Sequence, residues 1–344
     1  MLLPLMFATV AQADDLMDLI AKHQQNNLQQ VAYIPQQAYQ DNTQQNFEEA
    51  DDIEVLFQDD PLLLMLQSLD SAITDEDIEV FKFNYQNNNK LATPRLSSLA
   101  AMVVDAENNN VLYQKNSNRT LPIASISKLM SAMVVLDSNP DMKQVLTISN
   151  DDVDRLKGSS SRLTVGTTMT RQDMLHVGLM SSENRAIHAM ARAYPGGLDA
   201  FMKAMNKKAA DLGMNNTVFY DPTGLDPRNQ STAQDLVRMV KAAYEYPLIR
   251  QYSTSNNGAV KTSKGKVEKY HNSNRLIHTG DWDIKLQKTG YIREAGRCMV
   301  VYANIKNKPL IIVLMNAPST TMRVNDANSM RSWVMSNDKL LQEM

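Results

Sequence analysis

The sequence contains one cysteine, Cys298, so no internal disulfide can form among its 344 residues. No apolar run reaches the ~18 residues that span a bilayer, so the chain offers no candidate transmembrane anchor. Basic residues do not predominate: the formal net charge is −3, which argues against nucleic acid or an anionic membrane as a partner. The five histidines have no metal-ligand spacing with one another or with Cys298. We therefore expect neither a metal site nor a cofactor.

The charge is unevenly distributed along the chain. Residues 1–98 carry 16 acidic and 4 basic side chains, a net charge of −12, which leaves +9 for the remainder. The acidic part is also rich in Gln and Asn, a composition that buries little apolar surface. We predict an arm over residues 14–96 that is partly helical or disordered, and that either docks on the rest of the chain or solubilises it.

The first residues, MLLPLMFATVAQADD, combine a short apolar run with Ala11-Gln12-Ala13. This A-x-A pattern is typical of a signal-peptidase site, although a basic segment before the apolar run is missing. We interpret residues 1–13 as the remnant of a signal peptide and expect an exported, soluble protein. The alternative is a short N-terminus that touches a membrane.

From residue 97 onward the patterns change to those of a globular domain. Strand-like runs at 99–105 and 110–115 precede a mostly helical block from Ser125 to about Lys241. A strand near 284–292, a hairpin over 296–317 and a final helix over 325–335 follow. This order predicts an α+β fold, in which an antiparallel sheet pairs the first and last strands and is flanked by helices.

The helix expected to start within PIASISKLMSAMVV, residues 122–135, places Lys128 among apolar neighbours. Ser125 and Ser131 each lie three residues from Lys128 and therefore share a helix face with it, whereas Ser127 points elsewhere. Ser125 is at the helix start, where its backbone N–H is not used by the helix and can stabilise an oxyanion. A buried lysine loses its charge and can act as a base. The alternative is a capping serine followed by a lysine whose amine reaches solvent.

Two further motifs carry polar groups at spacings that suit a binding site. Ser182 and Asn184 lie at an irregular point between two apolar helical runs, where both can face one cavity. Lys288, Thr289 and Gly290 lie on a predicted strand, where charge and hydroxyl suit a carboxylate and the glycine leaves room for a substrate. Each motif alone is weak: a polar helix junction and an ordinary strand would explain them equally well.

In this order, Ser-x-x-Lys, Ser-x-Asn and Lys-Thr-Gly form the motif set of penicillin-binding proteins and serine β-lactamases. The chain resembles that superfamily, and within it the D-alanyl-D-alanine carboxypeptidase family, closest to the endopeptidase branch of the penicillin-binding protein 7 type. Further segments carry the resemblance, among them AMVVDAENNNVLYQKN, LGMNNTVFYDPTGL and KTGYIREAGRCMV. It covers about residues 97–335 and implies a β-lactamase-like or transpeptidase-like fold with an all-helical lobe, over a catalytic domain at 97–344.

The resemblance implies a role for each motif residue in a serine DD-peptidase acting on peptidoglycan peptides and acylated by β-lactam antibiotics. Three would be catalytic: the nucleophile Ser125, its general base Lys128, and Ser182, which passes the proton to the leaving amine. The others would bind substrate. Asn184 would bond the substrate amide, and Lys288 and Thr289, on the strand with Gly290, would hold the substrate carboxylate. The backbone N–H groups of Tyr291 and Ser125 would bind the oxyanion.

Two departures from the family pattern qualify this expectation. Ile292 stands where many relatives have Thr or Ser, which removes a hydroxyl contact to the carboxylate and favours crosslinked over terminal substrate. No Glu-x-x-Leu-Asn segment occurs, so the deacylating glutamate of common β-lactamases has no counterpart. We expect a periplasmic DD-endopeptidase whose arm offers a binding segment for a wall protein. The alternatives are a DD-carboxypeptidase and a non-catalytic wall-binding or regulatory relative.

Overall fold

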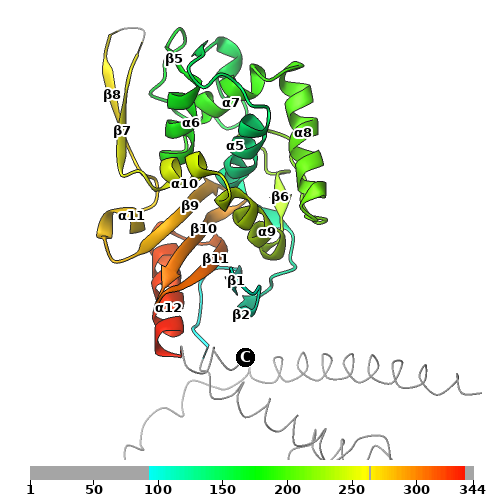
Figure 1. Ribbon diagram of the computed structural model, residues 1–344, viewed down its shortest axis with the longest axis vertical. Coiled ribbons are helices and arrows are strands. Elements are labelled where there is room, and N and C mark those ends of the chain that lie inside the picture. The colour runs from blue at the N-terminus through cyan, green and yellow to red at the C-terminus, as the bar shows by residue number, and fades with distance from the viewer. Residues whose placement is uncertain (1–92, 263–264, 338–344) are drawn as a thin grey trace, which may run out of the picture. The chain divides into compact units, whose positions relative to one another are not determined.

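The computed structural model describes residues 93–262 and 265–337. The signal-peptide remnant predicted at 1–13 and almost all of the arm predicted at 14–96 lie outside these residues. Within them the fold is α+β, as the order of sequence patterns predicted (Figure 1).

A five-stranded antiparallel sheet forms the centre of the described region, in the order β2-β1-β11-β10-β9. The first strand pairs with the last, since Ala100 lies opposite Met315, and this confirms the predicted closure of the sheet. The apolar runs of β10 and β11 lie inside the sheet rather than at its edges. This position suits them because both faces of an inner strand are covered, which favours apolar residues along its whole length. The strands are β1 (Ala100–Asp105), β2 (Val111–Lys115), β9 (Asp283–Ile292), β10 (Gly296–Ile305) and β11 (Lys308–Ala317).

Alternate residues of the central strands belong to two different cores, because successive Cβ atoms point to opposite faces of a sheet. Val104, Val300 and Ile311 pack against the helical lobe. Val103 belongs to the core under the last helix, α12 (Thr320–Ser336), which contributes Trp333 to it. The sheet is therefore covered by helices on both faces, with α12 on the face away from the lobe (Figure 1).

The lobe is helical except for short strand pairs, and its central helix begins at Lys128. Most of that helix is buried, which agrees with its predicted apolar character. The lobe and its connections contain η1 (Ala124–Ser127), α5 (Lys128–Asp137), η2 (Asn150–Asp152), α6 (Arg171–Met180), α7 (Asn184–Arg192), α8 (Gly197–Asp211), α9 (Ala233–Tyr244) and α10 (Pro247–Thr254), with strands β3 (Leu121–Pro122), β4 (Val145–Thr147), β5 (Thr168–Thr170) and β6 (Gln230–Ser231).

One hairpin was not predicted from the sequence. It consists of β7 (Asn257–Lys261) and β8 (Val267–His271), extends beside α6, and leads through α11 (Leu276–Thr279) into β9 (Figure 1). Val260 and Tyr270 are its buried apolar residues, so the alternation that normally identifies a strand is weak. No helix in the described part of the chain is long and apolar enough to cross a membrane.

Candidate active site

Ser125 lies in the short 3₁₀-helix η1, directly before α5. The helix begins at Ala124, whose φ of +47° lies in the left-handed region. The Ser125 hydroxyl accepts a hydrogen bond of 2.7 Å from Lys128 Nζ. The Ser127 hydroxyl donates to Ala124 O (2.9 Å) and that of Ser131 to Pro222 O (2.6 Å). Ser125 is thus the one of the three serines whose side chain contacts Lys128.

Lys128 is fully buried and donates three hydrogen bonds, as many as an ammonium group has protons. Besides Ser125 Oγ, the acceptors are Asn184 Oδ1 at 2.7 Å and Thr223 O at 2.6 Å. Burial lowers the pKa of Lys128 to about 7, against the opposing charges of Asp221 and Glu183. At neutral pH a large fraction of the amine is therefore uncharged, and it lies within contact of the Ser125 hydroxyl.

The Ser182–Asn184 segment is the irregular junction predicted between two helices. α6 ends at Met180 and α7 begins at Asn184, while Ser182 takes a left-handed φ of +66°. Glu183 caps α7 by accepting from the Arg185 N–H, and this sets the position of Asn184. Ser182 and Asn184 both line a cavity of about 350 Å³. Within the described residues, Ser182 makes no hydrogen bond to Lys128 or Lys288.

The third motif lies on β9, the edge strand nearest to η1. A Cβ atom at Gly290 would lie 2.9 Å from the Ser125 nitrogen, so the strand passes this close only because residue 290 has no side chain. Lys288 is fully buried and donates to Thr289 O at 2.8 Å. Its burial, and then the charge of Lys128, lower the pKa of Lys288 well below the usual value. The Thr289 hydroxyl is 2.8 Å from the hydroxyl of Ser273.

The residues that follow Gly290 differ in exposure. The Tyr291 ring is exposed and the Arg297 guanidinium stacks on it, with 3.5 Å between the guanidinium carbon and the ring centroid. Ile292 is buried in the core shared with the helical lobe. Its side chain is therefore packed inside the protein, and a carboxylate bound at Thr289 would receive no contact from a hydroxyl at position 292.

Sequence reasoning missed one part of the site, the turn at residues 220–229 between α8 and β6. It supplies the Thr223 carbonyl that accepts from Lys128. Gly224 packs so closely that a Cβ atom there would lie 1.9 Å from the carbonyl oxygen of Ala124. Asn229, fully buried, donates to Ser127 Oγ at 3.0 Å and so joins the turn to η1, the helix that contains Ser125. The signal was present in the sequence as DPTGL, a turn pattern with a glycine at positive φ.

Cys298 and His188 have structural roles. Cys298 is buried on β10, and this burial raises the pKa of its thiol to about 11, which leaves it protonated and unreactive. His188 Nδ1 lies 2.8 Å from the carboxylate of buried Asp152, which also bonds Arg192. Hydrogen bonds from these two side chains overcome the opposing effect of burial and lower the Asp152 pKa to about 2.

Comparison with known proteins identifies relatives over most of the described region. Residues 72–319 match the family described as D-alanyl-D-alanine carboxypeptidase. The chain is 43% identical to the D-alanyl-D-alanine endopeptidase of Escherichia coli over 70% of its length and 78% of that protein. It is also 43% identical to the Pseudomonas aeruginosa endopeptidase, again over 70% of the chain and 77% of the relative.

A solved structure agrees with these sequence matches. The crystal structure of the Streptomyces K15 DD-transpeptidase superposes with a TM-score of 0.67 at 25% identity, covering 71% of this chain and 99% of that one. The family match begins at residue 72, within the segment assigned to the arm, so the domain boundary at residue 97 stays a prediction.

Proposed function

Because the chain belongs to the D-alanyl-D-alanine carboxypeptidase family of serine peptidases, we propose that it hydrolyses D-alanyl peptide bonds in peptidoglycan and cuts crosslinks. The observation that carries this proposal is the buried contact between Ser125 Oγ and Lys128 Nζ. A serine hydroxyl is a weak nucleophile until a neighbouring base takes its proton, and a lysine with a pKa of about 7 can do so at neutral pH.

The proposed reaction assigns each contact a step. Ser125 Oγ attacks the D-alanyl carbonyl while Lys128 takes its proton, and the N–H groups of Ser125 and Tyr291 bind the developing oxyanion. Ser182 then passes a proton to the leaving amine, and water hydrolyses the ester formed on Ser125. The same attack on the strained amide of a β-lactam gives a covalent adduct.

Substrate binding is proposed for the remaining motif residues. Asn184 contacts Lys128 through its oxygen, so its amide group lies beside the nucleophile and can also bond the substrate amide. Lys288 and Thr289 lie next to Gly290, which packs against Ser125, and would hold the substrate carboxylate. In this role Lys288 gains a negative partner, which raises its pKa again.

Cleavage of crosslinks is favoured over trimming of terminal D-alanine by the two endopeptidase relatives at 43% identity. The family pattern supports the same choice, since Ile292 stands where many relatives have a residue with a hydroxyl.

Digestion of purified crosslinked muropeptides distinguishes the endopeptidase from the carboxypeptidase activity. We expect dimers to disappear without loss of terminal D-alanine from monomers, as followed by mass spectrometry. Release of free D-alanine from intact dimers would instead identify a carboxypeptidase, and no change in either pool would identify a non-catalytic relative.

The rate of acylation should rise with pH through a midpoint near 7. Lys128 accepts the Ser125 proton only when it is uncharged, and its pKa is about 7, so the rate falls as pH decreases below that value. The measurement is the rate of labelling by a fluorescent penicillin between pH 5 and pH 9, with circular dichroism to verify that the protein stays folded. A rate that is constant or falls over this range would rule out Lys128 as the base.

We also propose that the chain acts in the periplasm, because the proposed substrate, peptidoglycan, lies outside the cytoplasmic membrane. The A-x-A pattern at residues 11–13 supports export. Binding of a wall protein by the acidic arm stays a prediction from its composition, as the arm falls almost wholly outside the described residues.

A further inference from the structure

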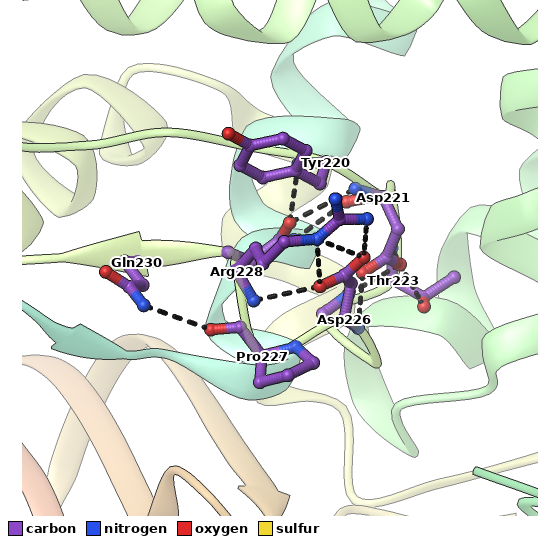
Figure 2. Close-up of polar contacts among 9 residues, drawn as sticks. Tyr220, Asp221, Thr223, Asp226, Pro227, Arg228 and Gln230 are labelled. Atoms are coloured by element: carbon purple, nitrogen blue, oxygen red, sulfur yellow. Dashed lines mark hydrogen bonds and ion pairs between the residues drawn. The ribbon is translucent and has the colours of Figure 1, made fainter. Parts of the chain in front are cut away.

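Asp221 holds the turn at residues 220–229 together, yet it has no part in the reaction proposed above. Its Oδ1 accepts from the N–H groups of Thr223 (2.6 Å) and Gly224 (3.0 Å) and from the Thr223 hydroxyl. Its Oδ2 accepts from the N–H of Asp226 at 2.8 Å. Figure 2 shows Asp221, Thr223 and Asp226 gathered in the turn, with Arg228 beside them. Four donors therefore converge on one carboxylate.

One peptide group connects this carboxylate to the base. The peptide between Thr223 and Gly224 donates its N–H to Asp221 Oδ1, and its carbonyl accepts from Lys128 Nζ at 2.6 Å. The two hydrogen bonds lie at opposite ends of the same planar unit, so fixing one end fixes the other. A peptide polarised by a carboxylate at its N–H is also a stronger acceptor at its oxygen.

We propose that Asp221 is a positioning residue that aims Lys128 at Ser125 through the Thr223–Gly224 peptide group. Its importance for turnover rests on the proposed function, whereas its link to Lys128 does not.

The charge of Asp221 supports the same assignment. Three titratable groups interact electrostatically with Lys128: Asp221 on the turn, Glu183 before α7, and Lys288 on β9. The two carboxylates raise the pKa of Lys128 against the larger effect of burial. Lys288 is affected in the other direction, since the charge of Lys128 lowers the pKa of Lys288. Neither carboxylate bonds the amine directly. Removing the charge of Asp221 should therefore let the pKa of Lys128 fall further.

The turn contains a matched control. Asp226 is also buried and carboxylic, but its side chain bonds Arg228, at 2.6 Å from Oδ2 to Nη2, and does not bond the Thr223–Gly224 peptide. Arg228 in turn stacks over the exposed Tyr220 ring. A carboxylate-to-amide change at Asp226 disturbs the same turn at its outer side, so it reports what general loosening of the turn does.

The experiment compares Asp221→Asn and Asp226→Asn with the wild-type full chain. In the first measurement, the protein carries lysine enriched in ¹³C at Cε and is titrated by NMR, and the Lys128 signal is identified by its loss in Lys128→Ala. In the second measurement, the rate of covalent labelling by a fluorescent penicillin is followed across pH. For Asp221→Asn we expect a Lys128 midpoint about one pH unit lower and a maximal labelling rate about tenfold lower. For Asp226→Asn we expect neither change.

Asp221→Glu restores the charge with a longer side chain, so it should keep the midpoint and still lower the maximal rate. If Asp221→Asn does not fold, Asp221→Glu provides the test of positioning in its place. The proposal is overturned if Asp221→Asn matches Asp226→Asn in both measurements, or if Asp221→Glu labels at the wild-type rate. If the wild type is not labelled at all, the proposed function fails, while the NMR titration still decides whether Asp221 acts on Lys128.

Discussion

Ser125→Ala should abolish covalent labelling by a fluorescent penicillin, with a loss of about a thousandfold or more. The hydroxyl of Ser125 is the group that the buried Lys128 amine contacts at 2.7 Å, and without it no ester can form. The fold should be little affected, since Ser125 is only partly buried. Gel fluorescence after incubation with the penicillin measures the labelling, and thermal unfolding in parallel measures the stability of the fold.

Ser127→Ala is the matched control for this prediction. Its hydroxyl bonds Ala124 O and Asn229 Nδ2 rather than Lys128, so its removal should lower the unfolding temperature but leave labelling in place. If the Ser125 variant were still labelled, or if the Ser127 variant alone lost labelling, the nucleophile would have been assigned to the wrong serine.

The contact between Ser125 and Lys128 was predictable because it is local. Both residues lie within one turn of the same helical segment, where a three-residue spacing places their side chains on one face. Ser131 has the same spacing but lies one turn deeper and bonds Pro222 O, so the position of Ser125 at the helix start was the second part of the prediction. The strand pairing at the centre of the sheet was predictable for a related reason, since long apolar runs such as the one around Ile312 can be buried only in the middle of a covered sheet.

The turn at residues 220–229 was not predictable in the same way. Thr223 and Lys128 are 95 residues apart, and the acceptor is a backbone carbonyl, which every residue type carries. A side-chain motif therefore leaves no trace of this contact. The glycine at position 224 was a local clue to a turn, but its neighbour Ala124 belongs to a distant part of the chain. Only the folded structure shows which backbone the glycine accommodates.

The junction at Ser182 was only partly predictable from the sequence. Apolar runs on both sides of Ser182 predicted that the helix would be interrupted, and α6 and α7 are separated there. The pattern did not specify that Ser182 would take a positive φ, a conformation that is strained for serine and common at functional sites. That conformation turns Ser182 and Asn184 toward the same cavity.

Gly224→Ala should reduce penicillin labelling at least a hundredfold, by moving the turn that contacts both Ala124 and Lys128. Its φ of +83° is unfavourable for alanine by about 1 kcal/mol, and the new Cβ would also lie 1.9 Å from Ala124 O. Such a contact cannot be tolerated without a shift of the turn or of η1, and either shift separates Lys128 from Thr223 O or displaces Ser125. The loss of labelling should therefore exceed what the backbone strain alone would cause.

Gly280→Ala separates the two effects. Gly280 has a comparable φ of +74°, but a Cβ atom there would have no other atom within 4 Å. The substitution should cost about 1 kcal/mol of unfolding free energy and leave the labelling rate unchanged. Thermal unfolding and timed labelling of both variants provide the comparison. If Gly224→Ala labelled as fast as Gly280→Ala, the close packing of the turn against Ala124 would not be what holds Ser125 and Lys128 in contact.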